Sequence, residues 1–196
     1  GTTEETVSAF HDAIIKRAKI ISISTGGKTE ALAKIHGLLH IALPSGFHPR
    51  QAIGYSLLIL YSVLSALFSH ANLQNDLEEC VALIGEKRKE YIFESPGNAA
   101  RRAAEIISKQ AVVIYSSERM SAAAVRLKGQ ICENAKFLAF ANAIPEMTHN
   151  EIVGWDGIKD RAESSFDVIL LRDAADHEHI QKRFEFVKKT LSEKAA

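Results

Sequence analysis

Cysteine is scarce in this sequence, and the two cysteines that occur have no neighbouring partner. Cys80 and Cys132 lie far apart in a chain of 196 residues, and neither belongs to a C-x-x-C pair. This spacing disfavours a structural zinc site and indicates a reduced, cytoplasmic chain. We expect both cysteines to be core residues rather than nucleophiles.

The sequence also lacks an excess of charge and a long apolar run. Lys and Arg total 24, Asp and Glu total 24, and the net charge is zero, so nothing favours nucleic acid or an anionic membrane as a partner. The longest apolar run, from Leu57 to Phe68, is broken by Tyr61, Ser62 and Ser65 and is too short to span a bilayer. We therefore expect a globular chain that binds neither nucleic acid nor a membrane.

What the sequence does have is an alternation of strand and helix patterns. Hydrophobic residues make up 46% and charged residues 24%, as in ordinary globular proteins. Short β-branched or apolar runs alternate with helical periodicity, which predicts parallel sheets. The expected strands are 19–24, 40–43, 111–115, 137–141 and 166–171. The expected helices are 7–18, 29–36, 51–68, 72–93, 99–109, 121–136 and 176–194, and helix 51–68 is expected to be largely buried.

The two halves of the chain repeat the same strand–helix rhythm, which predicts an α/β protein of two related units. Each unit is expected to be a three-layer arrangement in which a parallel sheet lies between helices. We assign residues 1–71 to the first unit, the polar segment 72–95 to a helical connector, and 96–196 to the second unit. The turn residues Ser95-Pro96-Gly97-Asn98 mark the expected boundary.

The stretch from Pro145 to Trp155 combines groups that a plain loop does not need. It holds a proline turn, a histidine flanked by carboxylates and an amide, and the only tryptophan of the chain. The near-neutral pKa of a histidine suits proton transfer, although a loop histidine bonded to a neighbouring carbonyl explains His149 as well. We interpret the stretch as the wall of a pocket.

A second polar stretch lies upstream, on the helix expected at 121–136. Arg126, Gln130, Glu133 and Asn134 are spaced so that they share one helix face. That face carries a cation, two amides and a carboxylate that could act as a base. Without other information, a solvated helix glutamate is the commoner explanation of Glu133.

The chain opens with Gly1-Thr2-Thr3-Glu4-Glu5-Thr6, a junction between a loop and a helix. Thr2 and Glu5 have the spacing of a capping box. Hydroxyls and free N–H groups at a helix start form an anion site, but an ordinary helix cap explains the same residues and is favoured on this stretch alone. No strand precedes the loop, so the chain looks truncated here.

Four stretches in order resemble the bifunctional phosphoglucose/phosphomannose isomerases, which are built from SIS (sugar isomerase) domains. The opening loop resembles the end of the family's SxSGNTxET phosphate loop, with Thr2 where Asn is commoner, and Pro44-Ser45-Gly46 with Pro49-Arg50 resembles its PxG…PR segment. Residues 118–136 resemble its R-x-K-x-Q…ENxK helix, and 145–155 resemble PExxHNEIVGW almost residue for residue. The resemblance covers essentially the whole chain.

The resemblance implies an aldose–ketose isomerase that interconverts glucose 6-phosphate or mannose 6-phosphate with fructose 6-phosphate. Glu133 matches the base that moves a proton between C1 and C2, His149 the ring-opening acid/base, and Arg50 the cation that stabilises the enediolate. Arg50 also follows Pro49 at a strand-to-helix junction, where ligands of open α/β sheets gather. The phosphate-binding candidates are Thr2, Thr3 and Thr6. This chemistry requires neither a metal nor an organic cofactor.

Family members are dimers in which a histidine crosses the interface, so the resemblance implies a homodimer with shared active sites. The spacing agrees, because Glu133 and the His149 loop flank a strand of about five residues that separates its ends by roughly 17 Å. Family members also hold two complete SIS domains, so both units of this chain are expected to be incomplete, the first at its start and the second at its end.

Three other interpretations stay open. A SIS module that binds or senses a phosphosugar without catalysis would need the Thr2–Thr6 loop but neither Glu133 nor His149. An inactive fragment follows from the missing ends. The pair His177 and His179 on the terminal helix could ligate a metal, although no further ligand cluster is evident in the sequence.

Overall fold

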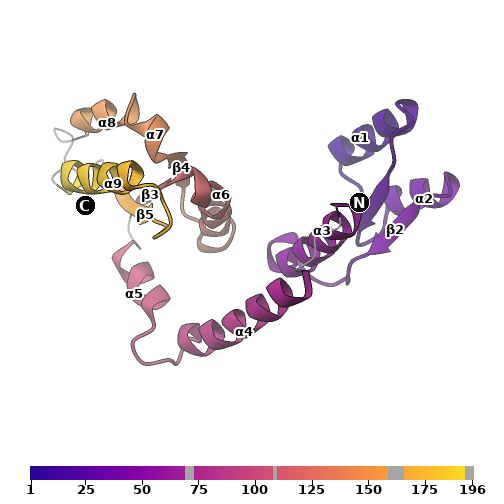
Figure 1. Cartoon of the computed structure of the whole chain (residues 1–196), viewed down its shortest axis with the longest axis horizontal. Helices are drawn as coiled ribbons and strands as arrows, with labels where there is room; N and C mark the ends of the chain where they lie inside the picture. The colour runs from indigo at the N-terminus through magenta and orange to yellow at the C-terminus, as the bar shows by residue number, and fades with distance from the viewer. Residues whose placement is uncertain (69–72, 108–109, 159–165, 193–196) are drawn as a thin grey trace. The chain divides into compact units, whose positions relative to one another are not determined.

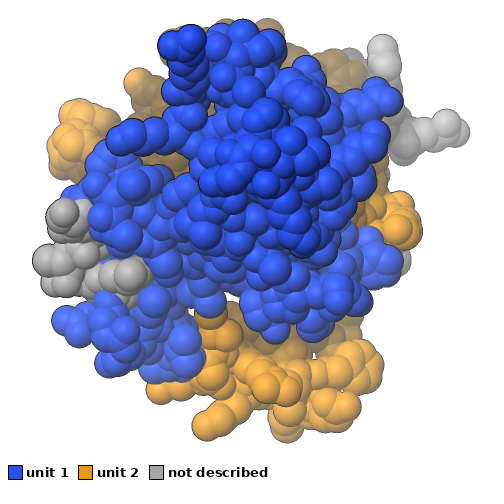
Figure 2. Space-filling view, turned by 90° about the vertical axis from the view of Figure 1, so that its right-hand side faces the viewer, with its two compact units in different colours: residues 1–82 blue, residues 83–196 orange. Residues whose placement is uncertain are grey.

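The computed structural model describes residues 1–68, 73–107, 110–158 and 166–192. The chain forms two compact units, Gly1–Ala82 and Leu83–Ala196 (Figure 2). The division falls inside a long helix within the segment 72–95, which the sequence predicts to be a connector.

Unit 1 is built on a strand–helix–strand element. Its first four elements are α1 (Glu4–Ile15), β1 (Ile21–Ser24), α2 (Lys28–Ile35) and β2 (Leu39–Ala42). β1 and β2 pair in parallel, with Ile21 opposite Leu39, and α2 links the strands (Figure 1). Gly26 and Gly27 have φ of 123° and 83°, a region that glycine adopts without strain, and they let the chain turn sharply from β1 into α2.

Two longer helices follow a short 3₁₀ turn, η1 (Pro49–Gln51). They are α3 (Ile53–Phe68) and α4 (Leu73–Tyr91), and α4 runs into unit 2. The prediction of a largely buried helix at 51–68 is wrong, because among the residues of α3 only Ser65 is buried. α3 is apolar around its whole circumference, and the elements of unit 1 cover too little of it. The side chains left exposed include Leu57, Leu60, Leu64, Leu67 and Phe68.

Unit 2 contains a three-stranded parallel sheet in the order β4-β3-β5 (Figure 1). Its longer elements are α5 (Ala99–Ile106), β3 (Ala111–Ser116), α6 (Ser121–Gln130), β4 (Ala139–Ala143), β5 (Phe166–Leu171) and α9 (Glu178–Leu191). Short turns connect them: η2 (Glu118–Met120), the π-helical η3 (Ile131–Ala135), α7 (Ile144–Met147), α8 (Glu151–Gly154) and η4 (Trp155–Gly157).

The unit 2 sheet is covered on both faces. Val112 and Ile114 of β3 pack with Ala139 and with Ala124 of α6 on one face, which we call the α6 face. The opposite face, called the α9 face, forms a larger cluster: Val113, Tyr115, Ile144, Met147, Trp155, Phe184, Val187 and Leu191. Alternate residues of a strand point to opposite faces, so β3 feeds both cores. These layers confirm the predicted α/β fold, in which parallel sheets lie between helices.

Several expected boundaries differ from those observed. The helix predicted at 121–136 is α-helical only to Gln130, continues as a π-helical turn, and ends where Lys136 adopts the left-handed conformation with φ of 62°. The following strand begins at Ala139 instead of residue 137.

The two cysteines differ in burial. Cys132 is half-buried, but Cys80 is exposed on the polar helix α4, so the predicted core position of Cys80 is wrong. In the described parts of the chain, no helix has the length and apolar character needed to cross a membrane.

Replacing Phe184 by Ala is expected to lower the free energy of unfolding by about 3–5 kcal/mol, because the phenyl ring is fully buried and its loss leaves a cavity. The matched control is Phe186→Ala on the same helix, where the side chain is 59% exposed and the loss should be small. Chemical denaturation of both variants checks this. Equal destabilisation would contradict the assignment of α9 to the core.

Candidate active site

The opening loop of unit 1 packs directly against the turn between β1 and α2. The carbonyl oxygen of Gly1 accepts a hydrogen bond from the backbone N–H of Thr29 at 3.0 Å. A Cβ added to Gly1 would lie 1.9 Å from the carbonyl oxygen of Gly26, so a glycine is required for this approach. The starts of α1 and α2 are therefore held side by side.

Hydroxyl groups gather beneath these two helix starts. The buried hydroxyl of Ser24 accepts hydrogen bonds from Thr29 Oγ1 and from the N–H of Gly26, both at 3.1 Å, and lies 3.0 Å from Nε2 of His40. The sequence reasoning missed Ser24 and Thr29, because it treated Thr25-Gly26-Gly27 only as a turn. The available signal was the run of hydroxyl residues at a strand end that leads into a helix.

The three threonines predicted to bind phosphate are exposed on the opening loop and the first turn of α1. Thr3 is the N-cap of α1 but makes no capping hydrogen bond; its hydroxyl lies 2.7 Å from that of Thr6. The predicted capping box of Thr2 and Glu5 is therefore wrong, because the helix begins one residue later than that spacing requires. The hydroxyls of Thr3 and Thr6 point to each other instead of closing the helix end.

Several of these hydroxyl residues line one hollow of about 780 Å³ in unit 1. Thr6, Ser24 and Thr29 line it, and so does Pro49, the residue before Arg50. Arg50 is half-buried in the 3₁₀ turn η1, which the side chain of Gln51 caps by accepting the N–H of His48 at 3.3 Å. Within unit 1, the structure thus brings Thr6 and the turn that carries Arg50 to one hollow.

Glu133 lies in the π-helical turn η3, with its side chain exposed. The amide of Asn134 donates to Oε1 of Gln130, as expected for residues four apart on one helix face, and Lys136 Nζ donates to the carbonyl oxygen of Glu133 at 2.6 Å. Arg126, one α-helical turn before Gln130, is half-buried. The carboxylate of Glu133 therefore stands at the surface beside polar neighbours.

His149 lies between α7 and α8, beyond the carboxyl end of β4. Its N–H donates to the carbonyl oxygen of Glu146 at 3.0 Å, and within the described residues its exposed imidazole forms no hydrogen bond. Glu133 precedes β4 and His149 follows it, and the five residues of β4 span roughly 17 Å. Unit 2 does not bring these two side chains to the same end of its sheet.

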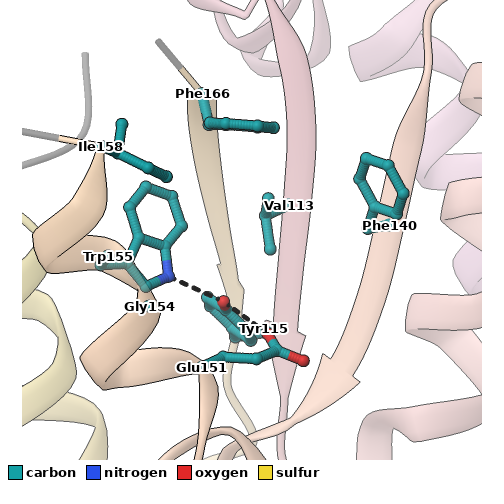
Figure 3. Close-up of a pocket in the computed structure, with 8 residues that line it drawn as sticks. All are labelled: Val113, Tyr115, Phe140, Glu151, Gly154, Trp155, Ile158 and Phe166. Atoms are coloured by element: carbon teal, nitrogen blue, oxygen red, sulfur yellow. Dashed lines mark hydrogen bonds between the residues drawn. The ribbon is translucent and has the colours of Figure 1, made fainter. Parts of the chain in front are cut away.

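A polar cluster joins Glu151 and Trp155, from the stretch interpreted as a pocket wall, to Tyr115 and Asn142, which the sequence reasoning missed. Figure 3 shows Tyr115, Glu151 and Trp155. Tyr115 Oη donates to Oε2 of Glu151 at 2.8 Å and accepts from Nε1 of Trp155 at 3.0 Å. Asn142 Nδ2 donates to Oε1 of Glu151 at 2.5 Å. Burial raises the pKa of the Tyr115 hydroxyl, and Glu151 raises it further, so Tyr115 stays a protonated donor.

Beside this cluster lies an apolar hollow of about 290 Å³ on the α9 face (Figure 3). Val113 forms its floor, while Phe140, Trp155 and Phe166 stand around it. The rings of Trp155 and Phe166 meet edge to face at 5.9 Å. This hollow offers apolar walls and a single carboxylate at its rim.

The two histidines considered as metal ligands on the terminal helix stack on each other. The rings of His177 and His179 are 5.0 Å apart, and His177 Nδ1 accepts the N–H of His179 to cap α9. Among the described residues, no group of three or more His, Cys, Asp or Glu side chains could hold a metal ion. His177 therefore acts as a helix cap.

Comparison with known proteins gives consistent matches along the chain. Residues 97–196 match the family model described as the bacterial phospho-glucose isomerase C-terminal SIS domain. The chain is 38% identical over 191 residues to the bifunctional phosphoglucose/phosphomannose isomerase of Caldicellulosiruptor bescii, which covers 96% of this chain and 56% of that protein. It is 32% identical over 196 residues to the protein of the same name from Aquifex aeolicus, covering 98% and 56%.

A third relative, from Sulfolobus acidocaldarius, is named D-glucosamine-6-phosphate 4-epimerase and is 28% identical over 158 residues, covering 78% of this chain and 47% of that protein. No solved structure gave a significant match. The chain spans about half the length of the curated relatives it matches. By the match of its second unit and the likeness along its length, the chain belongs to the bifunctional phosphoglucose/phosphomannose isomerase family of SIS-domain proteins.

Proposed function

We propose that the chain belongs to an enzyme that isomerises hexose 6-phosphates, interconverting glucose 6-phosphate or mannose 6-phosphate with fructose 6-phosphate. The observation that carries this proposal is the pair of exposed acid/base side chains, Glu133 and His149, in segments of a chain whose relatives are named for this reaction. Neither side chain serves the core of unit 2, so both are available for a substrate.

Glu133 is the proposed base of the proton transfer. Its carboxylate takes the proton from C2 of the open-chain aldose, which leaves an enediolate, and returns the proton to C1. The hydroxyl proton passes from O2 to O1 in the same conversion, which gives the ketose. Because the side chain is exposed at a helix end, it can face a substrate without moving the sheet.

His149 and Arg50 are the proposed partners of this base. The imidazole of His149 transfers a proton from the C1 hydroxyl to the ring oxygen, so that the bond between C1 and the ring oxygen breaks and the sugar opens before isomerisation. The guanidinium of Arg50 stabilises the negative charge that develops on the enediolate oxygens. In this scheme Glu133 and His149 transfer protons of the substrate, and Arg50 stabilises the charge that develops between the transfers.

The sugar phosphate is proposed to bind at the helix starts of unit 1. The N–H groups at the start of α1 attract an anion, and Thr2, Thr3 and Thr6 add hydroxyl donors. Ser24 and Thr29 line the adjoining hollow, whose volume of about 780 Å³ accommodates a hexose phosphate. In this proposal Ser24, at the end of β1, and Thr29, in the first turn of α2, extend the predicted phosphate loop.

We further propose a homodimer in which His149 of one subunit completes the site of the other. The support is the topology of unit 2, in which β4 separates Glu133 from His149. The apolar side chains exposed on α3 offer surface for such an association. A protein that only senses a phosphosugar would need neither Glu133 nor His149, so activity of the acid/base variants distinguishes the two functions.

The test of the proposed function is a coupled assay with fructose 6-phosphate, glucose 6-phosphate and mannose 6-phosphate. Because the chain spans 56% of the C. bescii relative, the assay compares the 196-residue chain with a chimera in which that relative supplies the flanking segments. Phosphosugar binding without turnover in both forms would favour a sensor. An absence of both binding and turnover would end the proposal.

In the active form, Glu133→Gln is expected to lower kcat on the order of 10²–10⁴-fold, because the amide cannot accept the proton. The matched control, Glu94→Gln, changes an exposed glutamate outside the proposed site and should leave kcat unchanged. Steady-state kinetics of both variants check this. Turnover that is insensitive to Glu133→Gln would remove this residue from the mechanism.

Thr3→Val is expected to raise KM for the phosphosugar by about tenfold with a smaller effect on kcat, because the lost hydroxyl binds the phosphate in ground state and transition state alike. Ser8→Ala, an exposed position farther along α1, serves as the control. Initial rates over a range of substrate concentrations separate the two parameters. An unchanged KM would show that the loop only starts the helix.

Mixing a Glu133→Gln subunit with a His149→Ala subunit is expected to restore activity, although each variant alone is inactive. In a mixed dimer one of the two shared sites receives both intact residues, so such a dimer regains about half of the normal sites. Activity is measured after exchange of differently tagged subunits has been verified. No recovery would place both residues in one chain.

A further inference from the structure

The carboxylate of Glu151 accepts hydrogen bonds from side chains of two neighbouring strands. Tyr115 is the fifth residue of β3 and lies opposite Asn142 in the parallel register of β3 and β4, so both side chains stand on the α9 face near the carboxyl ends of their strands. Each donates to a different oxygen of Glu151, Tyr115 to Oε2 and Asn142 to Oε1. We call Tyr115, Asn142 and Glu151 the carboxylate clamp.

The clamp is rigid because its members are fixed by further contacts. The side chain of Tyr115 is 1% exposed, and its oxygen also accepts from the buried indole of Trp155, which leaves one well-defined direction for its O–H. Oδ1 of Asn142 accepts the N–H of Ala143 at 2.8 Å, so its amide cannot flip without losing a bond. The donors are thus oriented before Glu151 meets them.

The clamp holds one end of the loop that carries His149. Asn150, directly after His149, links the two sides of the loop: its Nδ2 donates to Oε1 of Glu146 at 2.8 Å, and its Oδ1 accepts the N–H of Glu151 at 2.6 Å. The N–H of His149 donates to the carbonyl oxygen of Glu146. The backbone on both sides of His149 is therefore tied down, while its imidazole projects without a hydrogen bond to the described residues.

We propose that Glu151 is a positioning residue, which sets the direction of the His149 imidazole through the carboxylate clamp. This inference deepens the proposed function and rests on it, because the clamp matters to catalysis only where His149 transfers a proton. A proton donor displaced by about 1 Å loses on the order of 10²-fold in rate, so tying the loop to two sheet strands has a direct effect on kcat. Glu151 itself need not touch the sugar.

The clamp can be tested by exchanging the hydrogen-bond donor and acceptor groups of Asn142 and Glu151. Glu151→Gln replaces one acceptor oxygen by an NH₂ group, so only one of the two donors, Tyr115 or Asn142, keeps an acceptor. Adding Asn142→Asp supplies a new acceptor for that NH₂ group, while its second oxygen still accepts the N–H of Ala143. The double variant N142D/E151Q therefore restores every hydrogen bond of the clamp, with the carboxylate moved from α8 to β4.

Two measurements are made on the wild type, Glu151→Gln, N142D/E151Q and the control Val153→Ala, whose side chain is 67% exposed on α8. Hydrogen exchange of the amides of residues 148–154 is measured in the 196-residue chain and does not depend on activity. We expect exchange about tenfold faster in Glu151→Gln, with the exchange of β3 unchanged, and a return to the wild-type rate in the double variant.

The second measurement is the steady-state kinetics of the active form. The kcat should fall about 10–100-fold in Glu151→Gln, with KM within about twofold of the wild type, and should recover in the double variant.

The outcomes separate the positioning role from the proposed function. Acceleration of exchange throughout unit 2 would show a general loss of stability and overturn the proposal, as would a folded double variant without recovery of exchange or kcat. An unchanged kcat beside a loosened loop would also overturn it. A wild type that shows the expected exchange pattern but no turnover in either form would reject the proposed function and leave the clamp as a loop anchor alone.

Discussion

The burial of β3 on both faces is the constraint on which unit 2 depends. The strand lies between β4 and β5, and its residues from Val112 to Ser116 are buried. A parallel strand in this position needs helices on both faces, because each face would otherwise expose its apolar side chains to water. α6, which covers one face, leads into the turn that carries Glu133, and α7, which packs on the other face, leads into the His149 loop. The packing around one strand therefore decides where the candidate groups lie.

Parallel pairing also decides which end of the sheet gathers polar groups. The strand register aligns Tyr115 with Asn142 near the carboxyl ends of β3 and β4, and the chain leaves β4 for α7 and α8. In unit 1 the same logic places Ser24 at the end of β1, before the turn into α2. Ligand sites of α/β proteins commonly lie beyond such strand ends. Ser24 in unit 1 and the group Tyr115, Asn142 and Glu151 in unit 2 lie there, whereas Glu133 lies before β4, at the opposite end of the sheet.

The sequence predicts this fold wherever its pattern is local. The β-branched runs of β3 and β5 and the alternation of strands with helices give the α/β class and nearly every element. The tertiary relations are less accessible: the partners of Tyr115 lie 27 and 36 positions away, at Asn142 and Glu151, and no spacing rule connects them. Burial of α3 was overestimated for the same reason, since apolar composition shows that a surface seeks cover but not whether cover is present. Glu133, His149 and Arg50 were reachable because each lies in a motif that resembles a family pattern, and their roles remain proposals.

The environment of Trp155 gives the molecule a built-in optical reporter. It is the only tryptophan of the chain, it is buried, and its indole N–H is bonded to Tyr115. Excitation at the red edge of protein absorption therefore selects a single fluorophore in a single environment, in contact with the cluster that ties down the His149 loop. Its emission wavelength and anisotropy report the polarity and motion of that loop's anchor without any label, and the other tyrosines of the chain do not interfere.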